Sequence, residues 1–156
     1  MISYLKPDAL KKGDLVAIVS PSSTIKNFPK RIDRAIQAVE KMGFRVVVMP
    51  NALANDGYSA GTAQERADDI NAAFFDHSIK GILCSTGGLT ANAVLPFLDY
   101  ESIKKNPKVF CGFSDITTLL LALLKKCEII VFHGPTLLPS FGDFEGPIGF
   151  TEEGFL

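Results

Sequence analysis

The sequence has few of the features that mark a membrane or nucleic-acid-binding protein. Its longest apolar run covers residues 119–124, far below the roughly 20 residues that a membrane-spanning helix needs. No cluster of Lys and Arg is larger than a pair, and the net charge is −1. Nucleic acid and anionic membrane are therefore poor candidate partners. The N-terminus is charged throughout and lacks the apolar core of a signal peptide.

Cysteine and histidine are also scarce. The three cysteines, Cys84, Cys111 and Cys127, lie in or beside apolar runs, and no two have CxxC spacing. This pattern predicts reduced, mostly buried thiols in the cytoplasm, and neither a disulfide framework nor a zinc site. We expect no metal and no cofactor. The only histidines are His77 and His133, so few residues could act as a general base near neutral pH.

The sequence does contain enough apolar residues for a substantial core. Its 156 residues correspond to one domain by the usual length range. Apolar residues make up 47% and charged residues 21%, so the chain can bury a core and disorder is not expected.

Short apolar runs alternate with amphipathic helical patterns along the chain. The helices are expected to begin at Pro29, after Thr62 (with Glu65 completing a capping box), near Thr90 and after Ser114. The strands are predicted at residues 15–19, 44–49, 81–84, 109–111 and 129–132. We expect residues 101–108 to form a polar connection, and residues 138–156, broken by Gly and Pro, to close no element.

Five β–α alternations with strands buried on both faces predict an α/β fold. The expected architecture is an open, mostly parallel sheet with helices on both faces, of the flavodoxin-like or class I glutamine-amidotransferase-like type. Ligands of such sheets bind beyond the carboxyl ends of the strands. Four loops should lie there: residues 20–23 (SPSS), 85–88 (STGG), 112–115 (GFSD) and 133–135 (HGP).

Ser114 stands where a buried strand meets a helix, and two interpretations are open. It could cap the helix, because serine is among the best N-cap residues. It could also be a nucleophile, since Gly112 fits the first glycine of the G-x-S-x-G elbow, although Ile116 replaces the second. In that case the Asp115 N–H would be one oxyanion donor. Gly87 and Gly88 could bring a second donor close, or could simply form a tight turn.

A base and an acid to complete a catalytic triad are not evident. We expect His77 to be a solvated residue at the end of a surface helix and His133 to have a structural role. Asp14, Asp56 and Asp99 all fall at loops, where turn and cap roles are the default. The residues alone thus provide a candidate nucleophile and oxyanion hole without the remainder of a triad.

Several stretches taken together resemble the N-terminal half of the LD-carboxypeptidase family of serine peptidases, in its microcin self-immunity branch. The resemblance runs from Gly13 to about Thr151. The stretches that carry it are 13–22 (GDLVAIVSPS), 56–62 (DGYSAGT), 66–71 (RADDIN), 85–88 (STGG) with Asn92, 95–100 (LPFLDY), 106–117 (NPKVFCGFSDIT), 133–135 (HGP) and 138–142 (LPSFG).

The resemblance implies roles for particular residues. It implies that Ser114 is the nucleophile and that the N–H groups of Gly88 and Asp115 form the oxyanion hole. The substrate site would be lined by Thr86, Gly87 and Asn92. Murein-cleaving members tend to carry an arginine before the glycine pair and a tyrosine after it, whereas this chain has Thr86 and Leu89. The difference favours the self-immunity branch, and Leu89 and Ala91 also differ from that branch's commoner residues.

The resemblance also predicts the domain organisation. Members of the family carry the histidine and glutamate of a Ser–His–Glu triad on a C-terminal domain. We therefore expect residues 1–156 to be the nucleophile-bearing domain, with residues 138–156 crossing toward the second one. Phe141, Phe144, Ile148, Phe150, Phe155 and Leu156 should then form an apolar patch that makes the isolated domain self-associate. We expect the longer protein to be a homodimer.

The leading hypothesis is a serine carboxypeptidase-like hydrolase that acts on a small peptide or on a peptidyl nucleotide joined through an aspartyl amide. A murein tetrapeptide LD-carboxypeptidase is the first alternative. A non-catalytic domain that binds a small anion, with Ser114 only a cap, is the second. A class I glutamine amidotransferase shares the expected sheet but needs a cysteine at the elbow, and Ser114 argues against it.

Overall fold

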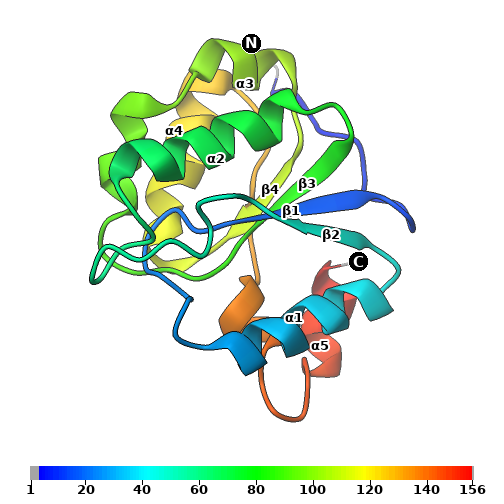
Figure 1. The fold of residues 1–156 in the computed structure, drawn as a ribbon. Coiled ribbons are helices and arrows are strands. Elements are labelled where there is room, and N and C mark those ends of the chain that lie inside the picture. The colour runs from blue at the N-terminus through cyan, green and yellow to red at the C-terminus, as the bar shows by residue number, and fades with distance from the viewer. Residues whose placement is uncertain (1–3, 156) are drawn as a thin grey trace.

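The computed structural model describes residues 4–155. They form a five-stranded sheet, which runs through the middle of the molecule (Figure 1). All neighbouring strands are parallel, and their order is β2-β1-β3-β4-β5. This is the flavodoxin-like order, so the expected α/β class is confirmed. The strands are β1 (Leu15–Val19), β2 (Arg45–Val48), β3 (Ile79–Cys84), β4 (Val109–Gly112) and β5 (Phe132–His133).

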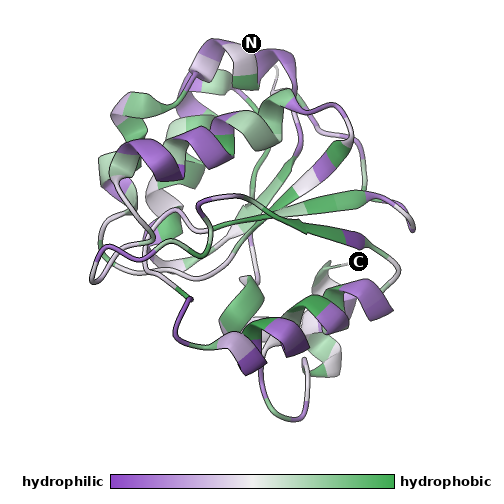
Figure 2. Cartoon of the chain, in the orientation of Figure 1, coloured by the Kyte–Doolittle hydropathy of each residue, from purple (hydrophilic) through white to green (hydrophobic). Residues whose placement is uncertain are grey.

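Helices cover both faces of the sheet, as expected. One face carries α2 (Ala63–Phe75), α3 (Tyr100–Lys105) and α4 (Thr117–Cys127), and the other carries α1 (Pro29–Lys41) and α5 (Gly149–Phe155) (Figure 1). Successive β1 residues alternate between the two cores, with Ala17 in one and Val16 and Ile18 in the other. Because both faces are buried, β1 is apolar throughout and the other strands are mostly apolar, so the centre of Figure 2 is largely green.

The helix starts follow the sequence signals. Pro29 occupies the first turn of α1, where its missing N–H costs nothing. Thr62 and Glu65 form the expected capping box at α2: the Glu65 N–H donates to Thr62 Oγ1 at 3.2 Å, and the Thr62 N–H donates to Glu65 Oε2 at 2.8 Å. No helix among residues 4–155 is long and apolar enough to span a membrane.

The structure differs from the expectation at one connection. The stretch expected to be a polar connection contains α3, which Asp99 caps by accepting from the Ser102 N–H at 3.0 Å. The helical segment expected near Thr90 is present as Ala91–Phe97, and it is a 3₁₀ helix. Pro96 lies inside it and has no N–H to donate to an α-helical ladder.

The prediction of a fifth strand at residues 129–132 was wrong in its position. Strand β5 holds only Phe132 and His133, because the preceding backbone pairs with the N-terminal segment. The Leu5 N–H donates to the Glu128 carbonyl at 2.7 Å, and the Ile130 N–H donates to the Leu5 carbonyl at 2.9 Å. Ile129 therefore forms an isolated parallel bridge with Leu5.

The prediction that residues 138–156 close no element was also wrong. A π-helical turn spans Leu137–Phe141, and α5 follows. Phe141 is fully buried and packs edge-to-face on Phe155 at 5.5 Å between ring centroids, so these two rings belong to the core rather than to an apolar patch. Exposed apolar side chains do remain at Phe144, Ile148 and Phe150. Leu156 lies outside the described residues.

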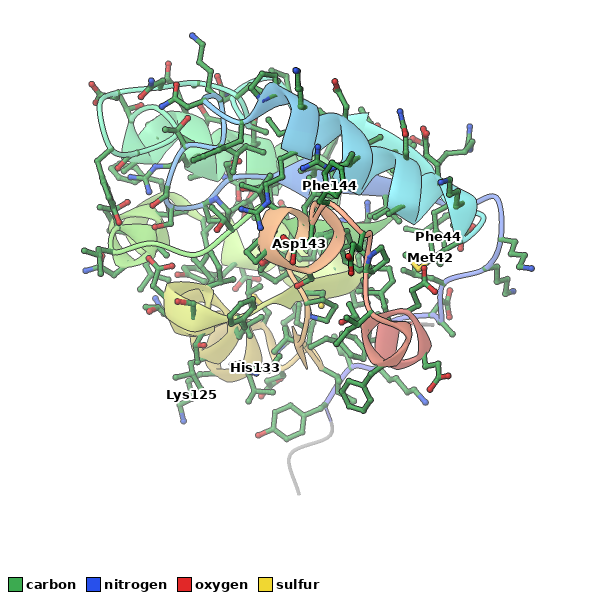
Figure 3. All side chains as sticks on the ribbon, turned by 90° about the horizontal axis from the view of Figure 1, so that it is seen from below. Met42, Phe44, Lys125, His133, Asp143 and Phe144 are labelled. Atoms are coloured by element: carbon green, nitrogen blue, oxygen red, sulfur yellow. The ribbon has the colours of Figure 1, made fainter. Side chains whose placement is uncertain are left out.

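Helix α1 holds the segment that precedes α5. Arg31 forms an ion pair with Asp143 at 2.5 Å, and Arg34 Nη2 donates to the Gly142 carbonyl at 3.1 Å. Arg34 also lies over the ring of Phe144, 5.9 Å from its centroid. In Figure 3, Asp143 and Phe144 lie beside α1, away from His133.

A buried carboxylate on α2 makes the stability of this domain depend on pH. Burial raises the pKa of Asp69 from 3.8 to about 6, although Asn51 donates hydrogen bonds to it from its backbone N–H and from Nδ2. The folded state therefore holds the Asp69 proton more tightly than the unfolded chain does. This contribution to stability is present below the unfolded pKa and is lost as the pH rises from about 4 to about 6, by roughly 3 kcal/mol at most.

The measurement is the free energy of unfolding in urea at several pH values for the wild type and for Asp69→Asn. Glu65, Asp76 and Asp99 have pKa values lowered by hydrogen bonds, so their contributions run the opposite way and the informative quantity is the difference between the two proteins. We expect wild type minus Asp69→Asn to decrease between about pH 4 and about pH 6. A constant difference would show that Asp69 does not titrate in that range.

Candidate active site

Ser114 lies at the turn between β4 and α4 in an unusual backbone conformation. Its φ is +64°, in the left-handed region, which costs a non-glycine residue about 1–3 kcal/mol and occurs most often at functional sites. The residue is exposed. The 3₁₀ turn Ser114–Ile116 and the following α4 both lack a side-chain cap hydrogen bond. The N-cap alternative therefore does not describe this serine.

Gly87, in the loop after β3, lies directly against Ser114. A Cβ added to Gly87 would be 2.7 Å from Ser114 Cβ and 2.9 Å from Ser114 Oγ. Gly112 has a similar constraint, because a Cβ there would be 2.8 Å from Ile116 Cγ2 and 3.1 Å from Cys84 Cβ. Ile116 is fully buried. The position of the elbow's second glycine is thus taken by Ile116, whose buried side chain packs over Gly112.

Gly88 approaches the loop after β1 just as closely. A Cβ on Gly88 would be 2.3 Å from Ser22 Oγ, 2.4 Å from Ser23 Oγ and 3.0 Å from the Ser23 nitrogen. The Ser23 N–H donates to the Gly87 carbonyl at 3.3 Å. Only a glycine fits between these two loops. Strands β1 and β3 are also where the strand order reverses, the usual ligand-binding point of such sheets.

Asp115 ties its own loop to the other two. Its Oδ2 accepts from Ser22 Oγ at 2.7 Å and from the Ala91 N–H at 3.1 Å. Its Oδ1 is buried and makes no hydrogen bond within residues 4–155. Because the side chain of Asp115 is held in this way, the backbone beside Ser114 is held too.

The remaining candidates from the sequence lie around this group. Thr86 is half-buried between β3 and Gly87, and Asn92 is exposed on the 3₁₀ segment. His133 is exposed at the end of β5 and lines a cavity of about 440 Å³ with Phe113 and Phe150. The structure therefore brings the loops after β1, β3 and β4 together, with the loop after β5 to one side.

His77 lies at the opposite edge of the sheet. It is exposed and lines a cavity with Asp14 and Lys80, at the amino ends of the strands. The three thiols are buried and unpaired. Burial raises the pKa of Cys111 to about 12 and that of Cys127 to about 11, so these thiols stay protonated and unreactive. Within residues 4–155, no cluster of three or more His, Cys, Asp or Glu side chains is arranged to hold a metal.

Sequence reasoning from the residues missed Arg66, a buried cation near this edge. Arg66 is 5% exposed. Its Nη1 donates to the Pro21 carbonyl at 2.6 Å, to the Thr90 carbonyl at 3.0 Å and to Thr90 Oγ1 at 3.1 Å. A signal was present, because Arg66 stands four residues before Ile70 and seven before Ala73, on the buried stripe of α2.

The fold and the loops at the carboxyl ends of its strands define an α/β protein of the flavodoxin-like class, with a strained serine after β4 that lies against the loop after β3. Within that class, the chain belongs to the LD-carboxypeptidase N-terminal domain family, whose model matches residues 16–134. The expected family is confirmed.

The relatives include proteins of both kinds that the sequence suggested. The microcin self-immunity protein MccF of Escherichia coli is 36% identical over 151 residues, which is 94% of this chain and 43% of MccF. The murein tetrapeptide carboxypeptidase of Pseudomonas aeruginosa is 30% identical over 121 residues, or 77% of this chain and 38% of that enzyme. The solved structure of MccF with aspartyl sulfamoyl adenosine has a TM-score of 0.93 at 35% identity, covering 97% of this chain and 45% of MccF. The chain thus spans less than half the length of these relatives.

Proposed function

We propose that this chain is the nucleophile-bearing part of a serine hydrolase that cleaves an amide bond at the carboxyl end of a small peptide-like substrate. The observation that carries the proposal is Ser114 itself. It is exposed, caps no helix and is held in the left-handed region at the carboxyl edge of the sheet. Strain of this kind at a strand-to-helix turn is what presents a nucleophile above an α/β sheet.

In the proposed reaction, Ser114 Oγ attacks the carbonyl carbon of the amide and a histidine accepts its proton. The N–H groups of Gly88 and Asp115 stabilise the oxyanion of the tetrahedral intermediate. The intermediate collapses when the amine leaves with the proton from the histidine, and water then hydrolyses the acyl-serine by the same route. Thr86, Gly87 and Asn92 would contact the substrate. The close fit of Gly87 to Ser114 and of Gly88 to Ser22 supports this arrangement.

The histidine and the glutamate that orients it are proposed to come from the region that corresponds to the rest of the longer relatives. His77 lies at the wrong edge of the sheet for this role. In this proposal residues 138–155 lead toward that region, and the exposed Phe144, Ile148 and Phe150 are available to contact it. The buried, unpaired cysteines support a reducing location such as the cytoplasm.

The preferred substrate is a peptidyl-aspartyl nucleotide amide. MccF, which is similar over nearly the whole chain, has been solved with aspartyl sulfamoyl adenosine. Leu89, directly after the glycine pair, is 80% exposed, and its apolar side chain offers no hydrogen bond to a murein peptide. The similarity to a murein tetrapeptide carboxypeptidase supports murein peptides as the second candidate. Hydrolysis of each substrate by the full-length protein distinguishes the two.

The reaction class is tested with a fluorophosphonate probe. We expect one probe per full-length protein molecule, attached at Ser114, and none on Ser114→Ala. The 156-residue chain alone should hydrolyse an aspartyl amide only at the background rate, because losing the base of a triad removes several orders of magnitude of rate. Failure of the full-length protein to react would favour the non-catalytic binding domain. Enzyme-like turnover by the 156-residue chain, abolished by Ser114→Ala, would contradict the proposed location of the base.

A further inference from the structure

We propose that Arg66 is a positioning residue for the oxyanion hole, acting through Thr90, Ser22 and Asp115. This inference rests on the proposed function, because it concerns the same Ser114 site. Arg66 projects from α2, not from any loop of the carboxyl edge. Its guanidinium nevertheless links two of those loops, by donating to the backbone carbonyls of Pro21 and Thr90.

A continuous series of hydrogen bonds runs from Arg66 to the residue beside the nucleophile. Thr90 accepts from Arg66 through its carbonyl and its hydroxyl, and the Thr90 N–H donates to Ser22 Oγ at 3.1 Å. Ser22 Oγ then donates to Asp115 Oδ2 at 2.7 Å. Thr90 Oγ1 is also within 3.0 Å of Ser59 Oγ, which leaves the hydroxyl with partners on both sides.

These bonds bracket the two proposed oxyanion donors. Gly88 lies between Thr90 and the Ser22–Ser23 backbone, where even a Cβ would be 2.3 Å from Ser22 Oγ. The second donor is the N–H of Asp115, whose side chain is the end of the series. A displacement of Ser22 or Thr90 would therefore move both donors, and a misplacement of about 1 Å can reduce a rate by about a hundredfold.

The positive charge of Arg66 would also favour an oxyanion at the Ser114 site. Asp115 puts a carboxylate beside the position where the oxyanion would form, and one of its oxygens is buried without a hydrogen bond from residues 4–155. Arg66 is a buried cation close enough for its charge to interact with that of Asp115. Burial lowers the pKa of Arg66 and the Asp115 carboxylate opposes that shift. The guanidinium thus offsets a negative charge that would otherwise disfavour the oxyanion.

A second buried cation, which contacts the other end of α2, provides a matched control. Lys108 is also a buried cation, 6% exposed, and its Nζ donates to the Ala73 carbonyl at 2.8 Å and to the Asp76 carbonyl. It secures the carboxyl end of α2 at the edge of the sheet away from Ser114. Loss of Lys108 should therefore destabilise α2 without moving the oxyanion donors.

The test measures the second-order rate of fluorophosphonate labelling at Ser114 in the full-length protein, with the urea midpoint of each variant recorded beside it. We expect Arg66→Met to lower the labelling rate by about tenfold to a hundredfold. In Arg66→Ala, whose short side chain leaves the guanidinium position empty, added guanidinium should restore part of the lost rate. Lys108→Met should keep the rate within about twofold of wild type despite a lower midpoint, since distant sites act independently.

A double-mutant cycle separates positioning from general destabilisation. Ser22→Ala removes the hydroxyl in the middle of the series with little change in volume. If Arg66 acts through Ser22, Arg66→Met combined with Ser22→Ala should label about as slowly as the slower single variant, because the effects of groups that act as a unit do not add. Additive effects would overturn the inference. So would a rate in Arg66→Met that stays at wild-type level, or a loss of rate in Lys108→Met as large as that in Arg66→Met at a similar urea midpoint. Ser114→Ala is measured in parallel, and labelling that survives it would overturn the proposed function instead.

Discussion

Replacing Gly87 by alanine is expected to lower the fluorophosphonate labelling rate of Ser114 by at least about a hundredfold. The new methyl group would stand 2.7 Å from Ser114 Cβ, well inside van der Waals contact. Rotation of the serine hydroxyl cannot relieve this overlap, because Cβ is fixed by the backbone. Ser114 is already held at a strained φ of +64°. The collision must therefore displace either the proposed nucleophile or the loop that carries Gly88.

Gly149→Ala is the matched control for this substitution. A Cβ at Gly149 meets no atom within 4 Å, so the same change in chemistry has no steric consequence there. We expect its labelling rate to stay within about twofold of that of the wild type. Normal labelling of Gly87→Ala would show that Ser114 does not react in the conformation described here. A hundredfold loss in Gly149→Ala would mean that the assay reports something other than the site.

Replacing Phe74 by alanine is expected to destabilise the domain by about 3–5 kcal/mol, which is the usual cost of removing a buried aromatic ring. Phe74 is 1% exposed on α2 and stacks on Phe110 of β4, with 5.9 Å between the ring centroids and 13° between the ring planes. Such a loss is a large fraction of the stability of a domain of this size. Phe110 precedes Ser114 on the same strand–turn unit, so the packing supports the site as well as the core.

The next residue in the chain provides the comparison. Phe75 is 69% exposed, and Phe75→Ala should change the free energy of unfolding by no more than about 0.5 kcal/mol. Urea denaturation of both variants, followed by circular dichroism, measures the difference directly. A larger loss in Phe75→Ala than in Phe74→Ala would show that the helix register of α2 is wrong, because a rotation of one residue exchanges these two rings.

Much of the fold could be predicted because buried parallel strands are apolar on both faces and helices show a clear period. Thr62 and Glu65 marked one helix start correctly, and the first four strands were placed within one or two residues at each end. The errors at the fifth strand and in residues 138–156 came from long-range pairing. Residues 128–130 form backbone hydrogen bonds with Leu5, which lies more than 120 positions earlier. No sequence pattern within residues 128–130 indicates that pairing. Phe155 was misjudged for the same reason, since its ring packs on Phe44, more than 100 positions earlier. Phe141 in turn packs on Phe155.

The residues of the candidate site were likewise predictable only in part. Glycines beside a serine at strand ends are local signals, and topology alone brings their loops to one edge. Arg66 was hidden because a charged residue on a helix is ordinarily solvent-facing. The spacing within α2 places Arg66 on the buried stripe, but it does not reveal the carbonyl groups of two other loops that accept from the guanidinium.

The hydrogen bond between Ser22 and Asp115 joins residues 93 positions apart, and this bears on when the site is assembled. Contacts of such large separation close long loops and are slow to form. The bond requires β1, β3 and β4 to be in register, with the loops beyond them already in place. Half of the chain cannot assemble the surroundings of Ser114 by itself. If Ser114 is the nucleophile proposed above, its reactivity requires this domain to be completely folded.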